Sequence, residues 1–218
     1  MNDTPIRVAV VTGGHSYDVP NFHRLFRALD GVEAYIQSID DFSASAKAVR
    51  EAYDVVLFYI MMMPTPENEG LPWYAGQPMT ALSELGETEQ GIVVLHHALL
   101  AYPEWPLWSE IVGIADRRFG YFFAETVSSE IMGDHPITHG ISPWTMIDET
   151  YTMASAGEDS RVLLTYDHPH SMKTIAWTRQ YHRCRVFCYE AGHDNATWPD
   201  PNFREVLRRG VLWAAHRI

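Results

Sequence analysis

The sequence has few cysteines and no long apolar segment. Its 218 residues include two cysteines, Cys184 and Cys188. They lie four residues apart on a predicted strand, roughly 13 Å from each other, which is too far for a local disulfide. We therefore expect free thiols in a reducing compartment. No apolar stretch approaches the roughly 20 residues of a membrane helix, and Met1–Pro5 lacks the basic and apolar regions of a signal peptide. These absences predict a cytoplasmic protein.

Basic residues are also scarce. Sixteen lysines and arginines stand against 28 acidic residues, which gives a formal net charge of −12. Nucleic acids and anionic membranes bind to basic patches, so we expect neither as a partner. The chain has no Gly-x-Ser-x-Gly motif of a serine hydrolase. Gly13 and Gly14 follow the first apolar run, but the third glycine of the dinucleotide fingerprint is absent.

The first half of the chain alternates between strand and helix patterns. Apolar runs predict strands over 6–11, 32–39, 53–60 and 91–95. Helical spacing predicts helices over 19–29, 43–52 and 80–89. This alternation indicates a parallel sheet flanked by helices. The connection over 61–78 is long for a compact domain and is typical of a functional or mobile loop.

The second half is richer in strands, so we expect a mixed sheet. Extended segments are predicted over 119–129, 144–147, 161–166, 175–178 and 185–189. Interrupted helical patterns follow residue 98 and continue over 108–112, and a last amphipathic helix is predicted over 202–215. No linker divides the chain, which predicts a single domain over 1–218.

Two histidines follow the buried strand Gly91–Leu95. In open α/β sheets ligands bind outside the carboxyl ends of the strands, where the imidazole of His96 or His97 could do chemistry. Adjacent side chains on a strand point to opposite faces, so one of them can enter the cleft and the other the core. Each can also be a hydrogen-bonded structural residue, and both interpretations stay open.

A second strand–turn–histidine pattern occurs near the carboxyl end of the chain, at Gly192-His193-Asp194. The glycine permits a turn, and the acidic neighbour can orient a ring or offset the charge of an imidazolium. We therefore expect His193 to be functional. In the competing interpretation, Asp194 simply caps the turn over 195–198.

The segment Asp148–Tyr151 supplies two acids and a phenol. If the segment is extended, Asp148 shares one face with Thr150. Glu149 then shares the other face with Tyr151. An acid that points inward can act as a general acid/base or as a metal ligand. The alternative is a solvated turn.

Three further histidines are candidates. His15 follows the glycine pair, and His168 and His170 flank a proline, so all three could face a pocket. No histidine has a local ligand spacing such as His-Glu-x-x-His. Any metal site would therefore be assembled from distant strand ends.

Several segments together resemble a known family. They are Val11–His15, Val94–Ala98, Asp134–Ile137, Asp148–Tyr151, Ile175–Trp177, Arg185–Phe187, Gly192–Asp194 and Gly210–Ala214. In this order and spacing the chain resembles the ThuA-like, or trehalose-utilisation, family of the class I glutamine amidotransferase-like superfamily. The resemblance covers about 8–214.

This resemblance implies a flavodoxin-like three-layer α/β sandwich, with a mostly parallel central sheet and helices on both faces. In amidotransferases a nucleophilic cysteine occupies a strand-to-helix elbow, and its histidine partner lies at a late strand end. The matching positions here hold His96 and His193. Without a thiol, a thioester has no nucleophile, so we do not expect glutaminase activity. His97 departs from the small residue that is usual after the elbow histidine.

The family is associated with disaccharide catabolism on oxidised (keto) sugars, which implies a small-molecule sugar ligand. The expected substrate-binding residues are His15, Tyr151, Trp105, Asp194 and His170. Trp73, Trp105 and Trp198 fit a sugar pocket, because the C–H faces of a sugar pack on aromatic rings. The same tryptophans also fit core packing.

The first hypothesis is a carbohydrate-active enzyme with His96, His193 and Glu149 as its catalytic residues. The histidines would act as acid/base groups, or as ligands of a divalent metal (Zn or Mn) that polarises a carbonyl or activates water. The alternative is a non-catalytic sugar-binding or regulatory module on an amidotransferase-like scaffold. A third is a structural subunit of an oligomer. A homodimer is the default expectation for soluble oligomers.

Overall fold

The computed structural model describes residues 4–218. Residues 1–3 lie outside the described part. They belong to the predicted domain over 1–218 and to Met1–Pro5, where no signal peptide is expected. The strands are β1 Ile6–Gly13, β2 Val32–Ser38, β3 Val55–Ile60, β4 Gly91–Leu95, β5 Gly120–Ile131, β6 Thr145–Thr152, β7 Arg161–Tyr166, β8 Thr174–Tyr181 and β9 Cys184–Tyr189. The helices are α1 Val19–Arg27, α2 Ile39–Ala44, α3 Lys47–Arg50, α4 Pro78–Ser83, the 3₁₀ turn η1 His96–Leu100, α5 Pro106–Val112 and α6 Pro201–Ala214.

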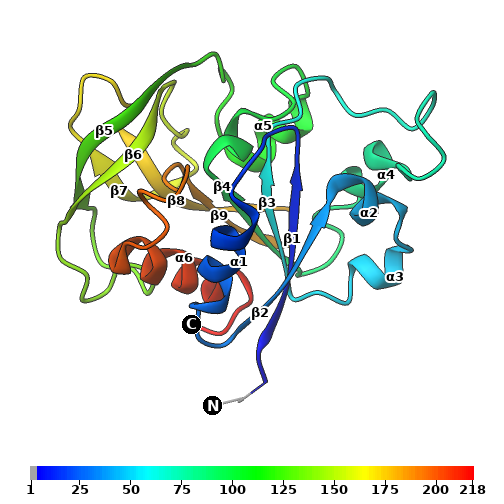
Figure 1. The fold of residues 1–218 in the computed structure, drawn as a ribbon, viewed down its shortest axis with the longest axis horizontal. Coiled ribbons are helices and arrows are strands. Elements are labelled where there is room, and N and C mark those ends of the chain that lie inside the picture. Colours follow the sequence, from blue (N-terminus) through cyan, green and yellow to red (C-terminus); the bar gives the residue numbers. More distant parts are fainter. Residues whose placement is uncertain (1–3) are drawn as a thin grey trace.

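The strands of the described chain form one nine-stranded sheet in the order β2-β1-β3-β4-β9-β8-β7-β5-β6. The strands β1, β2, β3 and β4 are parallel, and β4 pairs in parallel with β9. From β9 outward every pairing is antiparallel. Figure 1 shows the parallel strands on one side of the molecule and β5, β6 and β7 on the other.

The α/β class is therefore confirmed, and the prediction of a mostly parallel sheet is wrong. The physical reason is connection length: β8 and β9 are joined by the two residues between Tyr181 and Cys184. A short hairpin joins only antiparallel strands, whereas parallel strands need a crossover of a dozen residues or more. The closer description of the fold as flavodoxin-like stays a prediction.

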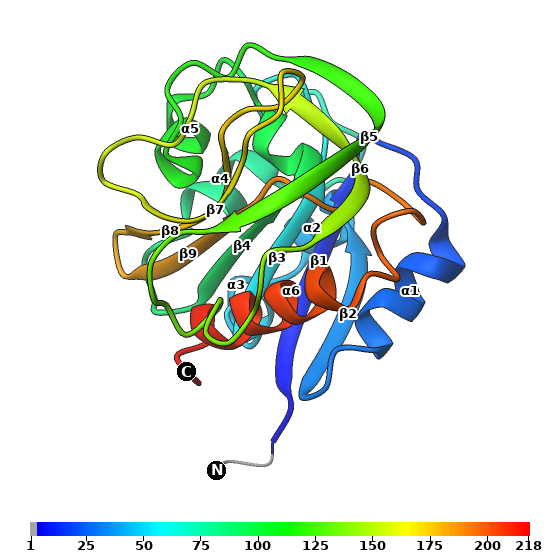
Figure 2. The same cartoon turned by 90° about the vertical axis from the view of Figure 1, so that its left-hand side faces the viewer.

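Helices cover both faces of the sheet (Figure 2). Alternation along β3 shows this directly, because Tyr59 packs against Phe22 of α1 whereas Phe58 packs against Phe42 of α2. On β9, Cys188 lies against the carbonyl of Val112 at the end of α5. Its neighbour Phe187 faces α6, where a Cβ on Gly210 would lie 2.1 Å from the Phe187 ring. Only glycine allows this close approach of α6.

The core lies around β3 and β4, in which every residue is buried. Such continuous apolar strands are typical of parallel sheets covered on both faces. No helix of the described residues is long and apolar enough to cross a membrane.

One local prediction is wrong, and another has bounds that are too short. The predicted helix over 43–52 is replaced by the short helices α2 and α3, because the Ser38 hydroxyl accepts a hydrogen bond from the Asp41 amide and starts α2 earlier. The short extended piece over 144–147 is the beginning of the longer strand β6. The segment Asp148–Tyr151 therefore lies on a strand rather than in a turn. The residues over 61–77 form no helix or strand, in agreement with the predicted long connection.

Candidate functional site

The strand β4 ends in a sharp turn at His96. This residue has φ 53°, in the left-handed region that non-glycine residues seldom occupy. Such a conformation persists only where the surroundings fix it, and here the ring is fully buried. Its Nδ1 lies 2.5 Å from the carbonyl oxygen of Glu190, at the end of β9. A carbonyl can only accept, so Nδ1 carries the proton and Nε2 points away from the strand.

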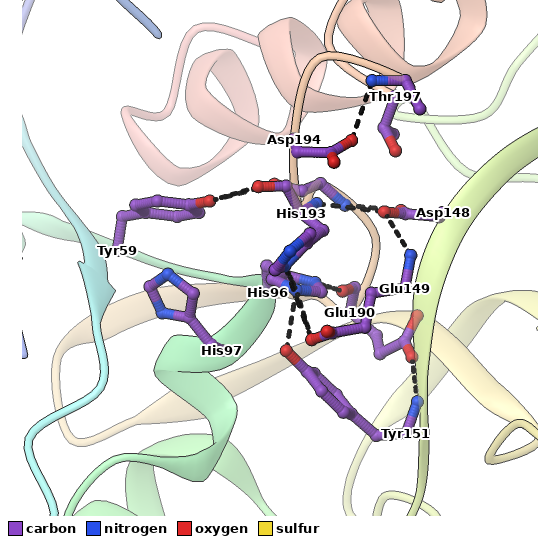
Figure 3. A network of polar contacts seen from close by, with 12 residues as sticks. Tyr59, His96, His97, Asp148, Glu149, Tyr151, Glu190, His193, Asp194 and Thr197 are labelled. Carbon is purple, nitrogen blue, oxygen red and sulfur yellow. Dashed lines mark hydrogen bonds and ion pairs between the residues drawn. The ribbon is translucent and has the colours of Figure 1, made fainter. Parts of the chain in front are cut away.

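His96 Nε2 lies close to two other atoms of the kind that bind metals, one from His193 and one from Glu149 (Figure 3). His193 Nδ1 lies 3.1 Å from His96 Nε2. Oε1 of Glu149 lies 3.4 Å from each of these two nitrogens. We call His96, Glu149 and His193 the His–Glu–His centre. The Tyr151 hydroxyl reaches the same point and lies 2.7 Å from His96 Nε2.

Both faces of the strand β6 carry side chains that position the centre. Glu149 and Tyr151 share the face that meets His96, as the alternation rule predicts. Asp148 is directed to the other side and accepts hydrogen bonds from the backbone amides of Gly192 and His193, at 2.7 and 3.0 Å. It thereby holds the loop between β9 and α6 that carries His193.

A second contact fixes the same loop from the parallel half of the sheet. The hydroxyl of Tyr59, on β3, donates to the carbonyl of His193 at 2.7 Å. The backbone of His193 is therefore held by side chains from two strands that are far apart in the sheet order. Among the described residues, sequence reasoning missed this role of Tyr59, because nothing in an apolar strand run distinguishes a hydroxyl that reaches a loop.

The centre is rich in carboxyl groups, and this sets its electrostatics. Burial opposes a charge on His96, but the adjacent Glu149 carboxylate and the nearby Asp148 and Glu190 outweigh burial and raise its pKa. Burial also opposes a charge on Glu149, but His96 and His193 hold its pKa below the usual range. The pKa of His193 is lowered by burial and by its proximity to His96. A cation at the meeting point of these atoms would be stabilised.

Glu190 is a buried acid beside the centre. Burial raises its pKa to about 8. Its Oε1 accepts a hydrogen bond from the Tyr151 amide at 2.9 Å, whereas Oε2 has no partner among the described residues. Glu190 therefore connects the end of β9 to β6 next to the centre.

A cavity of about 230 Å³ borders this centre through Glu149, whereas His96 and His193 are not among its lining residues. Its lining residues are His15, Met61, His97, Leu100, Phe119, Tyr121, Phe123, Glu149 and Tyr151. The structure thus brings Glu149, Tyr151 and His15 together in one wall. Phe119, Tyr121 and Phe123 form the aromatic side of the cavity, and they were not among the predicted binding residues. Their spacing of two could have predicted this side, because it places them on one face of an extended segment.

His97 lies in the wall of the cavity and differs from His96 in its partners. Its Nδ1 donates to the carbonyl of Ile60 at 3.0 Å. Burial and the neighbouring His96 lower its pKa well below the usual range. Its Nε2 has no hydrogen-bond partner among the described residues.

Three predicted substrate-binding residues do not line this cavity. Trp105 is buried and packs against Tyr102. Asp194 accepts a hydrogen bond from the Ala196 amide and caps its turn. His170 stacks on a phenylalanine ring elsewhere. Substrate roles for these residues stay predictions.

The other two tryptophans of the aromatic hypothesis also lie away from the cavity. Trp198 is buried against Phe22, and Trp73 is 95% exposed on the long connection after β3.

A second group of ligand-type residues consists of Glu125, His168 and His170. His170 Nδ1 lies 2.9 Å from Glu125 Oε1. His168 Nδ1 accepts a hydrogen bond from the His170 amide at 3.3 Å, so a neutral His168 keeps its proton on Nε2, which faces Glu125 at 3.6 Å. This nitrogen is therefore occupied by a proton rather than free for a metal.

The His–Glu–His centre, in contrast, has the dimensions of a zinc site. Ligand atoms bound tetrahedrally at about 2.0–2.1 Å lie about 3.3–3.4 Å from one another, and the three separations here are 3.1, 3.4 and 3.4 Å. Two histidines and one glutamate, with a fourth position left open, are a donor set of catalytic zinc sites. The Nδ1–H of His96 on a backbone carbonyl is the orienting contact that ligand histidines make. The residues present fit the metal.

Comparisons with known proteins agree with this fold. The model of the ThuA family, described as trehalose utilisation, matches residues 7–214. No curated protein matches the chain. A ThuA-like protein from Parabacteroides merdae superposes with a TM-score of 0.72 at 18% identity, and the match covers 97% of this chain and 90% of that chain. A cytoplasmic protein from Salmonella typhimurium gives 0.68 at 12% identity and covers 96% and 99%.

A β-galactosidase from Bacillus circulans sp. alkalophilus is also similar, with a TM-score of 0.61 at 14% identity. That match covers 95% of this chain but 31% of the larger chain. At these identities the solved structures show the fold alone, whereas the family match extends over nearly the whole chain and indicates a carbohydrate-related role. The amidotransferase-like superfamily stays a prediction. The chain belongs to the ThuA, or trehalose utilisation, family.

Proposed function

We propose that this protein is an enzyme of carbohydrate catabolism that acts on a disaccharide or on an oxidised, carbonyl-bearing sugar derivative. The observation that carries the proposal is the convergence of His96, Glu149 and His193 beside a cavity that Glu149 lines. Three lone-pair atoms at 3.1 to 3.4 Å need a shared cation or proton between them. The family's association with trehalose utilisation supports the choice of a sugar.

The residues that would hold a metal are His96, Glu149 and His193. Zinc suits two nitrogens and one oxygen better than manganese, which favours oxygen ligands. When bound, such an ion polarises a carbonyl or lowers the pKa of a water molecule.

The chain's own groups can move protons at the same place. His96 Nε2 is the basic nitrogen of a ring that the Glu190 carbonyl holds fixed. The Tyr151 hydroxyl has a pKa raised well above its usual range by burial and by Glu149, so it stays protonated and donates. Glu149 lies in the cavity wall, and its ionised carboxylate can accept a hydrogen bond from a ligand hydroxyl. The aromatic side of the cavity, formed by Phe119, Tyr121 and Phe123, offers an apolar surface on which one face of a ligand can pack.

Glutamine hydrolysis is not part of this proposal. The elbow carries an imidazole at His96, and both cysteines lie on β9 instead. Burial raises the pKa of the Cys184 thiol to about 11 and also raises that of Cys188. A nucleophilic thiolate is therefore disfavoured at both positions.

The test combines elemental analysis of the purified protein with a panel of trehalose, glucose and their keto derivatives, followed by mass spectrometry. We expect stoichiometric zinc and conversion of one sugar, both lost in His96→Ala. His139→Ala is the matched control, because its side chain is 79% exposed. Saturable sugar binding without product, in the presence or absence of zinc, would instead support a non-catalytic binding module.

A further inference from the structure

The Nε2 atom of His97 is a buried polar atom without a partner. The side chain is 1% exposed, and its other nitrogen is bonded to the carbonyl of Ile60. Among the described residues no donor or acceptor reaches Nε2. A buried polar group left unpaired costs free energy, so an orphan of this kind needs an explanation.

The contacts of the ring determine which kind of atom Nε2 is. A carbonyl accepts only, so Nδ1 carries the proton, and Nε2 of the neutral ring presents a lone pair. The rings packed around it belong to Tyr59, His15 and His96. None of them brings a carboxylate that would pair with an imidazolium at this position. Nε2 is therefore a hydrogen-bond acceptor that has no donor among the described residues.

The position of the ring shows where that donor must be. His97 lines the same cavity as Glu149 and Tyr151. Its ring centroid lies 5.5 Å from that of His96 and 4.6 Å from that of His15. Figure 3 shows the His97 ring beside the centre, with no hydrogen bond or ion pair to the other residues drawn. Because Nε2 itself is buried, a substituent of a group bound at the centre reaches it only when the rings packed around it shift slightly.

We propose that His97 Nε2 accepts a hydrogen bond from a hydroxyl group of the ligand, on the same ring that meets the His–Glu–His centre. This inference rests on the proposed function and narrows its substrate. The cavity of about 230 Å³ is smaller than the roughly 300–1,000 Å³ of drug-sized pockets, so it accommodates one sugar ring. His97 then selects rings with a free hydroxyl at one defined carbon.

The experiment uses D-glucose and its 2-, 3-, 4- and 6-deoxy analogues as probes, with binding measured by calorimetry. His97→Asn keeps an amide that can donate to the Ile60 carbonyl but is too short to place an acceptor at the position of Nε2. His97→Gln places an amide oxygen near the position of Nε2. We expect one deoxy analogue to bind wild type about tenfold more weakly than glucose, and this difference to vanish in His97→Asn. His97→Gln should recover part of it.

The outcomes separate the two proposals. If wild type binds glucose and His97→Asn keeps every deoxy penalty, the role of His97 is wrong and the sugar function stands. If wild type binds neither glucose nor trehalose, the proposed function fails and this inference with it. If both variants unfold, ¹⁵N-histidine spectra of the wild type decide: glucose must shift the unprotonated His97 nitrogen signal, and an unchanged signal overturns the proposal.

Discussion

Two groups in this molecule have the same composition, two histidines and one glutamate, but they differ in how their nitrogens are occupied. In the His–Glu–His centre the Nδ1–H of His96 is bonded to a strand-end carbonyl, which leaves the lone pair of Nε2 to accept from the Tyr151 hydroxyl or to bind a metal. In the group of Glu125, His168 and His170 a backbone amide occupies His168 Nδ1, which leaves the proton on Nε2. The difference shows that residue type alone does not make a ligand site.

Burial separates the two groups as well. The side chain of His96 is 0% exposed, whereas that of His170 is 46% exposed. An exposed ion pair is screened by water and contributes little to stability. A buried, converging set of lone pairs is costly unless protons or a cation pair with it, which favours cation binding at the centre over the exposed group. The predictions below test this contrast.

The largest effect is expected for turnover. His96→Ala removes the nitrogen at which the other two residues converge, so the rate should fall by at least about 10²-fold, as for the loss of an acid/base group. His168→Ala should leave turnover within about twofold, because its ring is held by Glu125 outside the cavity. The check is the rate of sugar conversion in both variants. An equal loss in the two variants would remove the contrast.

A smaller effect is expected when the support of the centre is changed. Asp148→Asn cannot accept from both loop amides, so it should loosen His193. We expect zinc affinity to fall about 10- to 100-fold and the free energy of unfolding to fall by about 1–3 kcal/mol. Metal titration and chemical denaturation measure the two quantities. The control is Asp134→Asn, whose side chain is 87% exposed, and similar losses there would contradict a positioning role.

The pH dependence of stability tests the buried acids of the centre. Because burial raises the pKa of Glu190 to about 8, the folded state retains this proton more tightly than the unfolded state, in which the pKa is about 4.3. The stability contributed by the protonated form is therefore lost as the pH rises from about 4.3 to 8. Glu190→Gln keeps an oxygen for the Tyr151 amide and should lose less stability over that range. The measurement is the melting temperature of wild type and Glu190→Gln from pH 5 to 9. The same pH dependence in both proteins would contradict this account.

The smallest effect is expected in the exposed group. His170→Ala breaks an ion pair with Glu125 and a stack on Phe122. The free energy of unfolding should fall by less than about 1 kcal/mol, because the side chain is half exposed. Denaturant unfolding checks this value. A much larger loss would show that this group has a structural role comparable to that of the centre.

Part of this contrast was predictable from the sequence. The strands β4 and β9 are both apolar runs followed by histidines, and the carboxyl ends of parallel strands meet at one edge. This is why His96 and His193 were expected to be functional, and their strands are indeed neighbours. Alternation on β6 also placed Glu149 with Tyr151, which the structure confirms as a geometric statement.

The rest depends on contacts that span the sheet. The strand β6 lies at the far end of the sheet order, five positions from β4, so no local pattern predicts that Glu149 reaches His96. Aromatic residues were equally ambiguous: Trp105 is buried beside Tyr102, whereas Phe123, on a strand of the antiparallel part, lines the cavity.

The most direct test of the central claim is a zinc titration of metal-free wild type, His96→Ala and His168→Ala under identical conditions. The account predicts one equivalent of tightly bound zinc in wild type and in His168→Ala, and none in His96→Ala. Zinc retained by His96→Ala, lost in His168→Ala or absent from wild type would contradict it.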